Sequence, residues 1–497
     1  MKSILGLFVC FVCLFLFAAP ASANEGCQET VVVTNVGDSG PGSLRDALIQ
    51  VCLGGEVAFD VPVPSAIVLT SGPLVVSYEM NINGPGADNL TVDGFDADRV
   101  FYIAGDNVTL RGLTVRRGYD DSTGGAGIYN IGQNVTLENM VVTDNAGTLA
   151  GGGVRNSGSM TISNSQIENN TVLVGSGGGI ANTGTLTLAG SRVRNNFSGA
   201  EGGGIANYSL LIMTVSELTG NTADEKGGGI YNYATGVALF GSASLSNNQS
   251  LNSSGGFAFN EGLLVVRKSA IAGNIALNKG AALRNYGDGG RMILHEARIV
   301  QNTSVNYNII QNDGNQLIIS RSLIAHNTSA GYTIFNGTPG FAAEMLIENS
   351  TISGNETTPG QAVMKLDSGS HASFQFSTFV DNQTSGNIVT GGGSTVEFLA
   401  TILENPAFDC TGSGYQSAGY NIGSDSSCLL YAPTDLPNTD ALLGPLFNYG
   451  GNTLTHKPLP GSPALDGGPT TCVDTDQRGV SRPQGNSCDI GAMEVVN

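Results

Sequence analysis

An asparagine returns every 25 to 28 residues through the middle of this chain, and this period limits the possible folds more than any other feature. The residues three and eight positions before it are apolar in all ten units, so three columns run in register. A unit of this length cannot enclose a core alone, whereas stacked units bury a continuous one. The period therefore predicts a solenoid. Its asparagines are Asn145, Asn170, Asn196, Asn221, Asn248, Asn274, Asn302, Asn327, Asn355 and Asn382.

The residues inside each unit indicate β-strands rather than helices. Apolar and polar side chains alternate in the segments 159–162 and 185–188, and glycine triplets such as 177–179 stand between the strand-like segments. Glycine is abundant, with 71 of 497 residues, but it follows no Gly-X-Y period, which excludes collagen. The predicted fold is all-β, a right-handed parallel β-helix with three short strands per turn.

A second asparagine column opens each unit. It lies 14 to 19 residues before the first column, so insertions gather at one edge of the solenoid, where loops commonly carry function. Asparagine tolerates left-handed turns and can bond the neighbouring coil, which gives both columns a structural role. The members of this column are Asn130, Asn156, Asn182, Asn207, Asn232, Asn260, Asn285, Asn312 and Asn336.

The start of the chain predicts export. Residues 1–23 combine Lys2, an apolar run and a small-x-small cleavage site, as in a secretory signal peptide. Six cysteines remain after its removal, and an even number in an exported protein favours disulfides. Fifteen pairings are possible in principle, of which we expect the near-neighbour set. These pairs are Cys27 with Cys52, Cys410 with Cys428 and Cys472 with Cys488.

The solenoid is expected to have covered ends. Residues 24–55 form the predicted N-terminal cap, in which Ser43 and Asp46 resemble a helix N-cap and open a short helix that ends near Gln50. Residues 56–405 carry the repeats. Residues 406–497 lose the period and gain prolines, so we expect a disulfide-linked C-terminal cap there.

Both ends also resemble known exported proteins. Residues 34–47 read TNVGDSGPGSLRDA, which resembles the entry motif of CSLREA-type β-helix proteins. Segments 443–446, 459–466, 476–479 and 488–494 (LGPL, LPGSPALD, DQRG and CDIGAME) resemble the choice-of-anchor Q domain. The repeats between them are similar to those of polymorphic outer-membrane and adhesin-like β-helices. The resemblance implies a secreted or cell-surface protein and brings no catalytic residues with it.

The charge of the chain restricts its partners. There are 41 acidic and 21 basic side chains, and this balance argues against nucleic acid. No apolar run after the signal is long enough to span a bilayer, and we expect a secreted or surface-exposed monomer. No cofactor is expected. Calcium is the one candidate, at Asp93, Asp96 and Asp98 or at Asp474 with Asp476, although neither group matches a known calcium loop.

Alternation after the glycine corners predicts a binding strip on successive coils. If the second asparagine column faces inward, its neighbours face outward and present aromatic side chains flanked by one acid and one arginine. Aromatic faces stack on sugar rings and charged groups bond hydroxyls or uronates, so we expect a glycan site. A purely structural aromatic ladder is the alternative. The strip contains Tyr208, Tyr231, Tyr233, Phe259, Glu261, Arg284 and Tyr286.

The sequence therefore predicts an exported interaction protein, adhesin-like or glycan-binding, that performs no catalysis. The alternative is a polysaccharide lyase or glycoside hydrolase of the β-helix type. A hydrolase requires paired carboxylates on neighbouring coils, and a lyase requires a cation site with a basic residue. The four histidines share no column, and no such pairing stands out. A third possibility is a structural spacer with no specific ligand.

Overall fold

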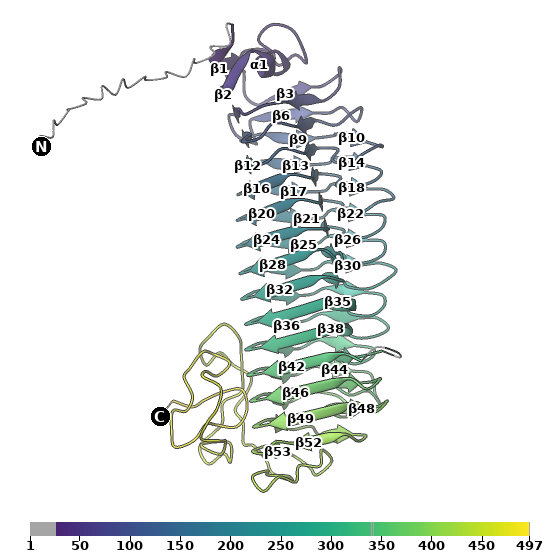
Figure 1. The fold of residues 1–497 in the computed structure, drawn as a ribbon, viewed down its shortest axis with the longest axis vertical. Helices are drawn as coiled ribbons and strands as arrows, with labels where there is room; N and C mark the ends of the chain where they lie inside the picture. The colour runs from purple at the N-terminus through teal and green to yellow at the C-terminus, as the bar shows by residue number, and fades with distance from the viewer. Residues whose placement is uncertain (1–25, 339, 341, 497) are drawn as a thin grey trace, which may run out of the picture.

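The protein is a parallel β-solenoid, as the asparagine period predicts (Figure 1). The computed structural model describes residues 26–338, 340 and 342–496. The predicted signal peptide, residues 1–23, lies outside this part of the chain. Within it, no helix has the length and apolar character needed to cross a membrane.

One coil illustrates the whole solenoid. Its strands are β19 (Ile180–Asn182), β20 (Thr185–Ala189), β21 (Arg192–Arg194) and β22 (Phe197–Ser198). Each pairs in parallel with the equivalent strand one coil further on, 25 residues later in the sequence. The coil thus contains four strands rather than the predicted three, because a turn after the asparagine of the second column divides one face into two strands.

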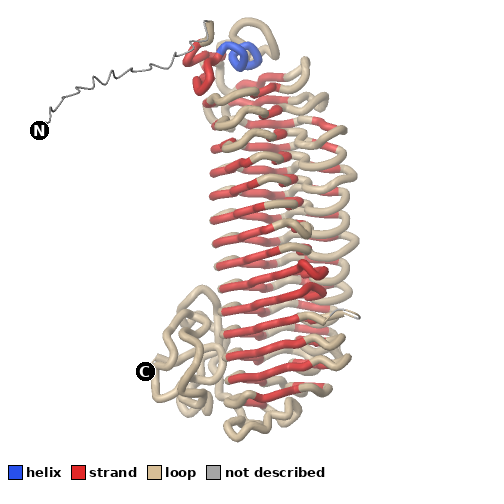
Figure 2. Tube along the Cα trace, in the orientation of Figure 1, coloured by secondary structure: helices blue, strands red, loops and turns tan. Residues whose placement is uncertain are grey.

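In the described part of the chain these strands form three long sheets, and the strands that face the viewer appear as stacked red segments in Figure 2. Sheet A has 28 strands and takes the first two strands of each coil, while sheet B has 15 strands and sheet C has 10. Sheet B runs from β3 (Ser65–Val68) to β53 (Ile422–Gly423), and sheet C from β10 (Tyr119–Asp120) to β44 (Glu356–Thr357).

The core follows the apolar columns that the repeat predicts. Val142, Ile167, Val193 and their counterparts in the later coils are completely buried, as is almost every residue of the column eight positions before the asparagine. Each buried aliphatic side chain contributes roughly 1.5–3 kcal/mol to the stability of the fold. Because the columns continue from coil to coil, one apolar core runs through the solenoid.

The first asparagine column forms a continuous hydrogen-bond ladder inside this core. From Asn145 to Asn382, each side-chain Nδ2 donates to the Oδ1 of the next ladder asparagine at 2.9–3.1 Å. The same Oδ1 accepts the backbone N–H of the preceding ladder residue. The left-handed conformation falls one position earlier than expected, for example at Asn169 and Asn195, both with φ of 54°. The ladder residues themselves therefore serve as buried hydrogen-bonding groups.

The N-terminal end is closed by the predicted helix, α1 (Leu44–Gln50). Ser43 is its N-cap and accepts a hydrogen bond from the Asp46 backbone, while the Asp46 carboxylate accepts one from Gly42 N–H. The first bond satisfies an N–H group that the first helical turn leaves free, and the second joins the residue before the N-cap to the helix. The Cys27–Cys52 disulfide links the segments on either side of α1.

The C-terminal region differs from the expected cap over the last coil. Leu436 continues sheet B by one bridge beyond Ile422, but residues 441–496 have no regular strand and lie along the side of the solenoid (Figures 1 and 2). They pack against sheet B, where Thr455 bonds Thr351 and His456 bonds Ser353, each at 2.9 Å. Their contacts use side chains more than 100 residues apart, which no local pattern reveals. The Cys410–Cys428 and Cys472–Cys488 disulfides are present as predicted.

Candidate functional site

The predicted strip lies along the first strands of sheet A. In β27 (Ile230–Asn232), β31 (Ala258–Asn260) and β35 (Leu283–His295), the residues Tyr231, Phe259 and Arg284 occupy equivalent positions on successive coils. Strand pairing continues this column to Gln311 and Phe335. The alternation rule thus identifies a real column, and that column extends beyond the last residue of the predicted strip.

The seven predicted residues come together as one cluster. The rings of Tyr208 and Tyr233 are stacked with centroids 3.8 Å apart, and those of Tyr231 and Phe259 are 5.2 Å apart. Phe259 in turn lies 5.6 Å from Tyr286. The remaining two members are Glu261 and Arg284. Glu261 accepts a hydrogen bond from the Tyr231 hydroxyl at 2.8 Å, and the Arg284 guanidinium lies over the rings of Phe259 and Tyr286.

Two of these rings are not available to a ligand, contrary to the expectation of an exposed strip. Tyr231 is 3% exposed and Phe259 is 2% exposed. The Lys226 ammonium lies over both rings at 5.5 and 5.2 Å, and neighbouring rings cover the rest. Alternation gives the face of the sheet on which a side chain lies, but it cannot show what covers that face. This part of the strip is therefore a structural aromatic ladder.

The phenol groups in this ladder are held in their neutral form. Burial raises the pKa of Tyr231, and the hydrogen bond to Glu261 raises it further. Burial likewise raises the pKa of Tyr233, whose hydroxyl donates to Ser176 Oγ at 3.3 Å across two coils. Neither phenol can act as a base at neutral pH, so the ladder supplies no proton acceptor through them.

An open groove begins where the ladder ends. One hollow, of about 180 Å³, is lined by Ser253, Ser254, Asn278, Lys279, Arg284 and Tyr307. A second, of about 390 Å³, shares Lys279 and Tyr307 with the first and continues past Asn308 and Gln311 to Tyr332, Phe335 and Gln361. We name the two hollows together the Tyr307 groove. Tyr307 itself is 45% exposed.

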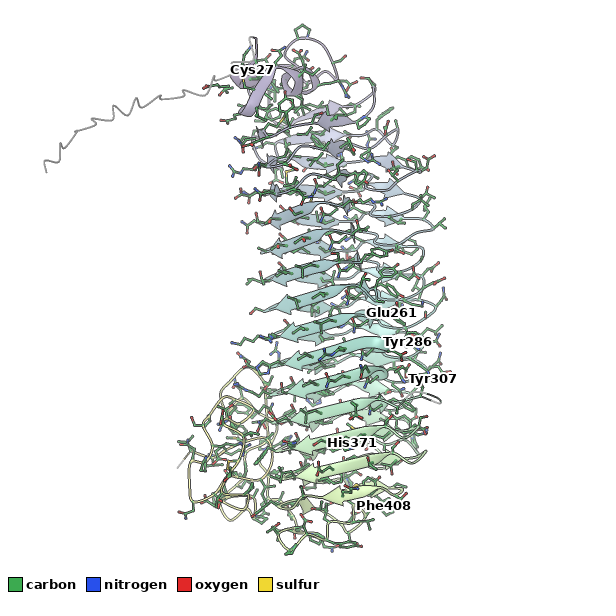
Figure 3. The ribbon with its side chains drawn as sticks, in the orientation of Figure 1. Cys27, Glu261, Tyr286, Tyr307, His371 and Phe408 are labelled. Atoms are coloured by element: carbon green, nitrogen blue, oxygen red, sulfur yellow. A yellow bond between two sulfur atoms is a disulfide. The ribbon has the colours of Figure 1, made fainter. Side chains whose placement is uncertain are left out.

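The Tyr307 groove runs along the axis of the solenoid. Its walls come from residues 253–254, 278–279, 306–308, 330–332 and 361, which lie on five successive coils. At the strand spacing of about 4.8 Å, this set spans roughly 20 Å. Figure 3 shows Glu261, Tyr286 and Tyr307 following one another down this edge. The loops of the groove lie between a first-column asparagine and the next second-column asparagine, so this is not the edge where the spacing of 14 to 19 residues predicts insertions.

The groove is polar and lacks acidic groups. No aspartate or glutamate is among the described residues that line its two hollows, although the chain has 41 acids. Arg284 is oriented by Asp313 at 3.1 Å and by Ser254 at 2.9 Å. Lys279 forms no ion pair within the described chain. The lining therefore offers positive charge, amides and aromatic faces.

Two buried polar atoms facing this region have no hydrogen-bond partner. They are Nε of Arg284, a donor, and Oε1 of Gln361, an acceptor. Asn308 donates to Gln311 and Gln311 donates to Asp313, each at 2.5 Å, and Asp313 also accepts from Arg284 at 3.1 Å. Buried polar groups usually find partners, so these two atoms leave unused hydrogen-bonding capacity in the wall of the groove.

In each suggested calcium group, one acid is paired with arginine. Although burial acts to raise the pKa of Asp93, hydrogen bonds from Arg117, the Phe95 backbone and Arg116 lower it below its usual value. Asp476 is paired with Arg478 at 2.7 Å. In the described part of the chain, no group of three histidine, cysteine or acidic side chains has the geometry to hold a metal ion.

Another hollow, of about 410 Å³, lies where the C-terminal segment meets the solenoid. Its lining includes Lys268, Glu296, Arg298 and Asn452. Glu296 is its one acid among the described lining residues and is bonded by Asn452 and by Arg321, whose Nη2 lies 3.3 Å away. This hollow therefore does not present the pair of free carboxylates that hydrolysis of a glycosidic bond requires.

The sequence analysis did not identify the three aromatic side chains of the groove. Phe335 could have been found by extending the outward column by two coils, because it pairs in register with Gln311. Tyr307 and Tyr332 lie in loops without alternation, outside the interval whose variable spacing predicts insertions, so no signal in the sequence pointed to them.

The fold and the groove define a parallel β-solenoid with a polar, aromatic-lined surface groove. No known protein-family model matches the chain, and no curated protein matches it. The motif resemblances at the two ends thus have no support from family models.

Three solved structures show overall likeness at low similarity. The pectate lyase Pel9A is 17% identical, with 94% of this chain and 97% of that chain covered and a TM-score of 0.27. A PL6 alginate lyase in complex with a trisaccharide is 12% identical, with coverages of 73% and 87% and a TM-score of 0.31. ORF18 of Geobacillus virus E2 is 12% identical, with coverages of 71% and 61% and a TM-score of 0.26. These scores are too low to decide function.

Proposed function

We propose that this protein is a secreted or surface-exposed, adhesin-like β-solenoid that binds carbohydrate in the Tyr307 groove and performs no catalysis. The observation that carries the proposal is the composition of the groove. It combines three aromatic side chains, Tyr307, Tyr332 and Phe335, with amides and cations, over five coils. Elongated polar grooves with aromatic faces suit sugar chains, because the rings stack on the sugar and the amides bond its hydroxyls.

Binding without cleavage is supported by the absence of acids from the described lining of the groove. A glycosidase uses two carboxylates that flank the scissile bond, and the residues that line these two hollows include no carboxylate. The second candidate function, a polysaccharide lyase, rests on Lys279. Its amine has no ion-pair partner in the described chain and stands in the same hollow as Arg284, as a base and a charge-neutralising group would.

A location outside the cytoplasm is supported by the disulfides and by the predicted signal peptide. Three disulfides join near neighbours at the two ends of the molecule. Disulfides persist in oxidising compartments and are rare in the cytosol. We propose that the protein acts as a monomer, with the groove facing a glycan of a cell surface or matrix.

The test is binding to a panel of plant, microbial and animal glycans, with the same mixtures scored for new reducing or unsaturated ends. The Tyr307→Ala variant should lose at least tenfold in affinity for every glycan that the native protein retains. Tyr431→Ala is the matched control, because it removes an exposed tyrosine that follows β53 and does not line the groove. Retention of no glycan, or equal retention by both variants, would refute the proposal. New unsaturated ends would favour the lyase.

A further inference from the structure

The cations of the Tyr307 groove point to a charged ligand. We propose that the groove selects an anionic glycan, whose carboxylate or sulfate groups bind Lys279 and Arg284; this inference rests on the proposed function. The residues that carry it are those where the two hollows meet, since Lys279 and Tyr307 line both hollows and Arg284 lines the first.

The charge distribution is the first argument. The chain has a formal net charge of −20, so most of its surface repels a polyanion. The described lining of the groove reverses this balance, with two cations and no acid. Lys365 extends the positive line at the far end, 5.5 Å from the Phe335 ring, although it is paired with Asp367. A neutral sugar gives no reason for such a local reversal.

The geometry of Arg284 is the second argument. Its two terminal nitrogens are held by Ser254 and Asp313, which fixes the plane of the guanidinium. Its Nε is buried and has no partner. A small shift of the groove wall would expose this N–H to a ligand oxygen, and an anionic oxygen would accept a charge-assisted hydrogen bond, which is stronger than a neutral one. Asp313 offsets the charge of Arg284, so the uncompensated positive charge of the groove lies on Lys279.

The position of the exposed aromatic side chain favours the same ligand. Tyr307 borders both hollows beside Lys279 and is well exposed. A sugar ring stacked on Tyr307 would place an acidic substituent within reach of the Lys279 ammonium. One residue then recognises the ring and the other recognises its charge, and this division predicts separable effects of the two substitutions.

The experiment compares polymers that share a backbone and differ in charge. The probes are carboxymethylcellulose against hydroxyethylcellulose, and dextran sulfate against dextran, each measured by affinity electrophoresis at low and high salt. The first pair tests a carboxylate and the second a sulfate. We expect at least tenfold tighter binding of one anionic polymer than of its neutral partner, and a loss of most of this advantage in high salt, where exposed charges are screened.

Three variants assign that preference to the groove. Lys279→Ala should lower the anionic affinity about tenfold, and Lys279→Arg should retain it because the charge remains. Lys268→Ala is the control, since it removes an equal charge from the hollow beside Glu296 and should change nothing. Thermal unfolding of each variant checks that the fold is intact.

The outcomes separate this inference from the proposed function. Equal binding of charged and neutral polymers, lost in Tyr307→Ala, would overturn the anionic preference and leave the proposed glycan binding standing. Anionic binding that survives Lys279→Ala, or that is lost in Lys268→Ala, would overturn the assignment to this groove. No binding of any polymer here, together with none across the glycan panel, would overturn both.

Discussion

Replacement of one rung of the asparagine ladder tests the structural basis of the solenoid. Asn221 is buried at the centre of the ladder, and Asn221→Ala removes five hydrogen bonds. Its Oδ1 accepts from the backbone and side chain of Asn196, and its Nδ2 donates to Asn248 and to two backbone carbonyls. The backbone N–H of Asn196 then loses its acceptor inside the core.

The expected loss follows from these contacts. A buried N–H without a partner costs about 1–3 kcal/mol, and each other lost hydrogen bond contributes about 0.5–1.5 kcal/mol. Asn196 Nδ2 keeps its bond to the Ile167 carbonyl, and Asn248 Oδ1 keeps the bond from the backbone of residue 221, so part of the network survives. We expect the free energy of unfolding to fall by about 3–5 kcal/mol.

Guanidinium denaturation followed by circular dichroism measures this change, and hydrogen exchange locates it. Protection should fall in the coils around residues 180–250 and persist in distant coils, because solenoid coils are coupled mainly to their neighbours. Asn252→Ala, on an exposed loop of an adjacent coil, should stay within about 0.5 kcal/mol of the native protein. If the two variants lose the same free energy, the ladder is not a stabilising element and this reasoning is wrong.

Other regions give further predictions. Burial, followed by the charge of Asp425, raises the pKa of Asp409 to about 7. The protonated Asp409 carboxyl therefore stabilises the folded state at low pH, and this contribution is lost as the pH rises through 7. Unfolding free energy should fall by about 2–3 kcal/mol between pH 5 and pH 8, and Asp409→Asn should flatten this dependence. Arg482→Met leaves the buried Glu494 carboxylate unpaired, and limited proteolysis should then cut residues 441–496 much faster, as expected from a cost of about 3–5 kcal/mol. Replacing Cys410 and Cys428 by serine should lower the unfolding free energy by about 3 kcal/mol in urea titrations; no change would contradict the role of this disulfide.

The sequence predicts the solenoid well because its determinants are periodic. The column of Val142 and the ladder of Asn145 recur at nearly fixed spacing, and both are buried as expected. The helix after Ser43 is also predicted correctly, since its cap depends on residues close together in the chain. Periodic and local signals are those that a single sequence displays.

The sequence predicts only part of the candidate site. The rest depends on contacts between residues that are neither periodic nor close together in the chain. The column position of Arg284 was correct, but the cover over Tyr231 and Phe259 comes from Lys226 and from rings on neighbouring coils. The lateral packing of the C-terminal segment depends on pairs such as Thr351 with Thr455, distant in sequence. Tyr307 belongs to a loop whose conformation no alternation describes.

Because the strands pair in regular register, successive coils are structurally equivalent. Ile180 lies opposite Ile205, and the glycine triplets before them occupy the same corner. Removal of the 25 residues from Ile180 to Gly204 would join Gly179 to Ile205 and bring each column into line again, with one fewer member in each of the two asparagine columns. The distance between the two ends of the molecule can thus change in whole steps of one coil, through duplication or loss of a short gene segment, while the Tyr307 groove stays intact.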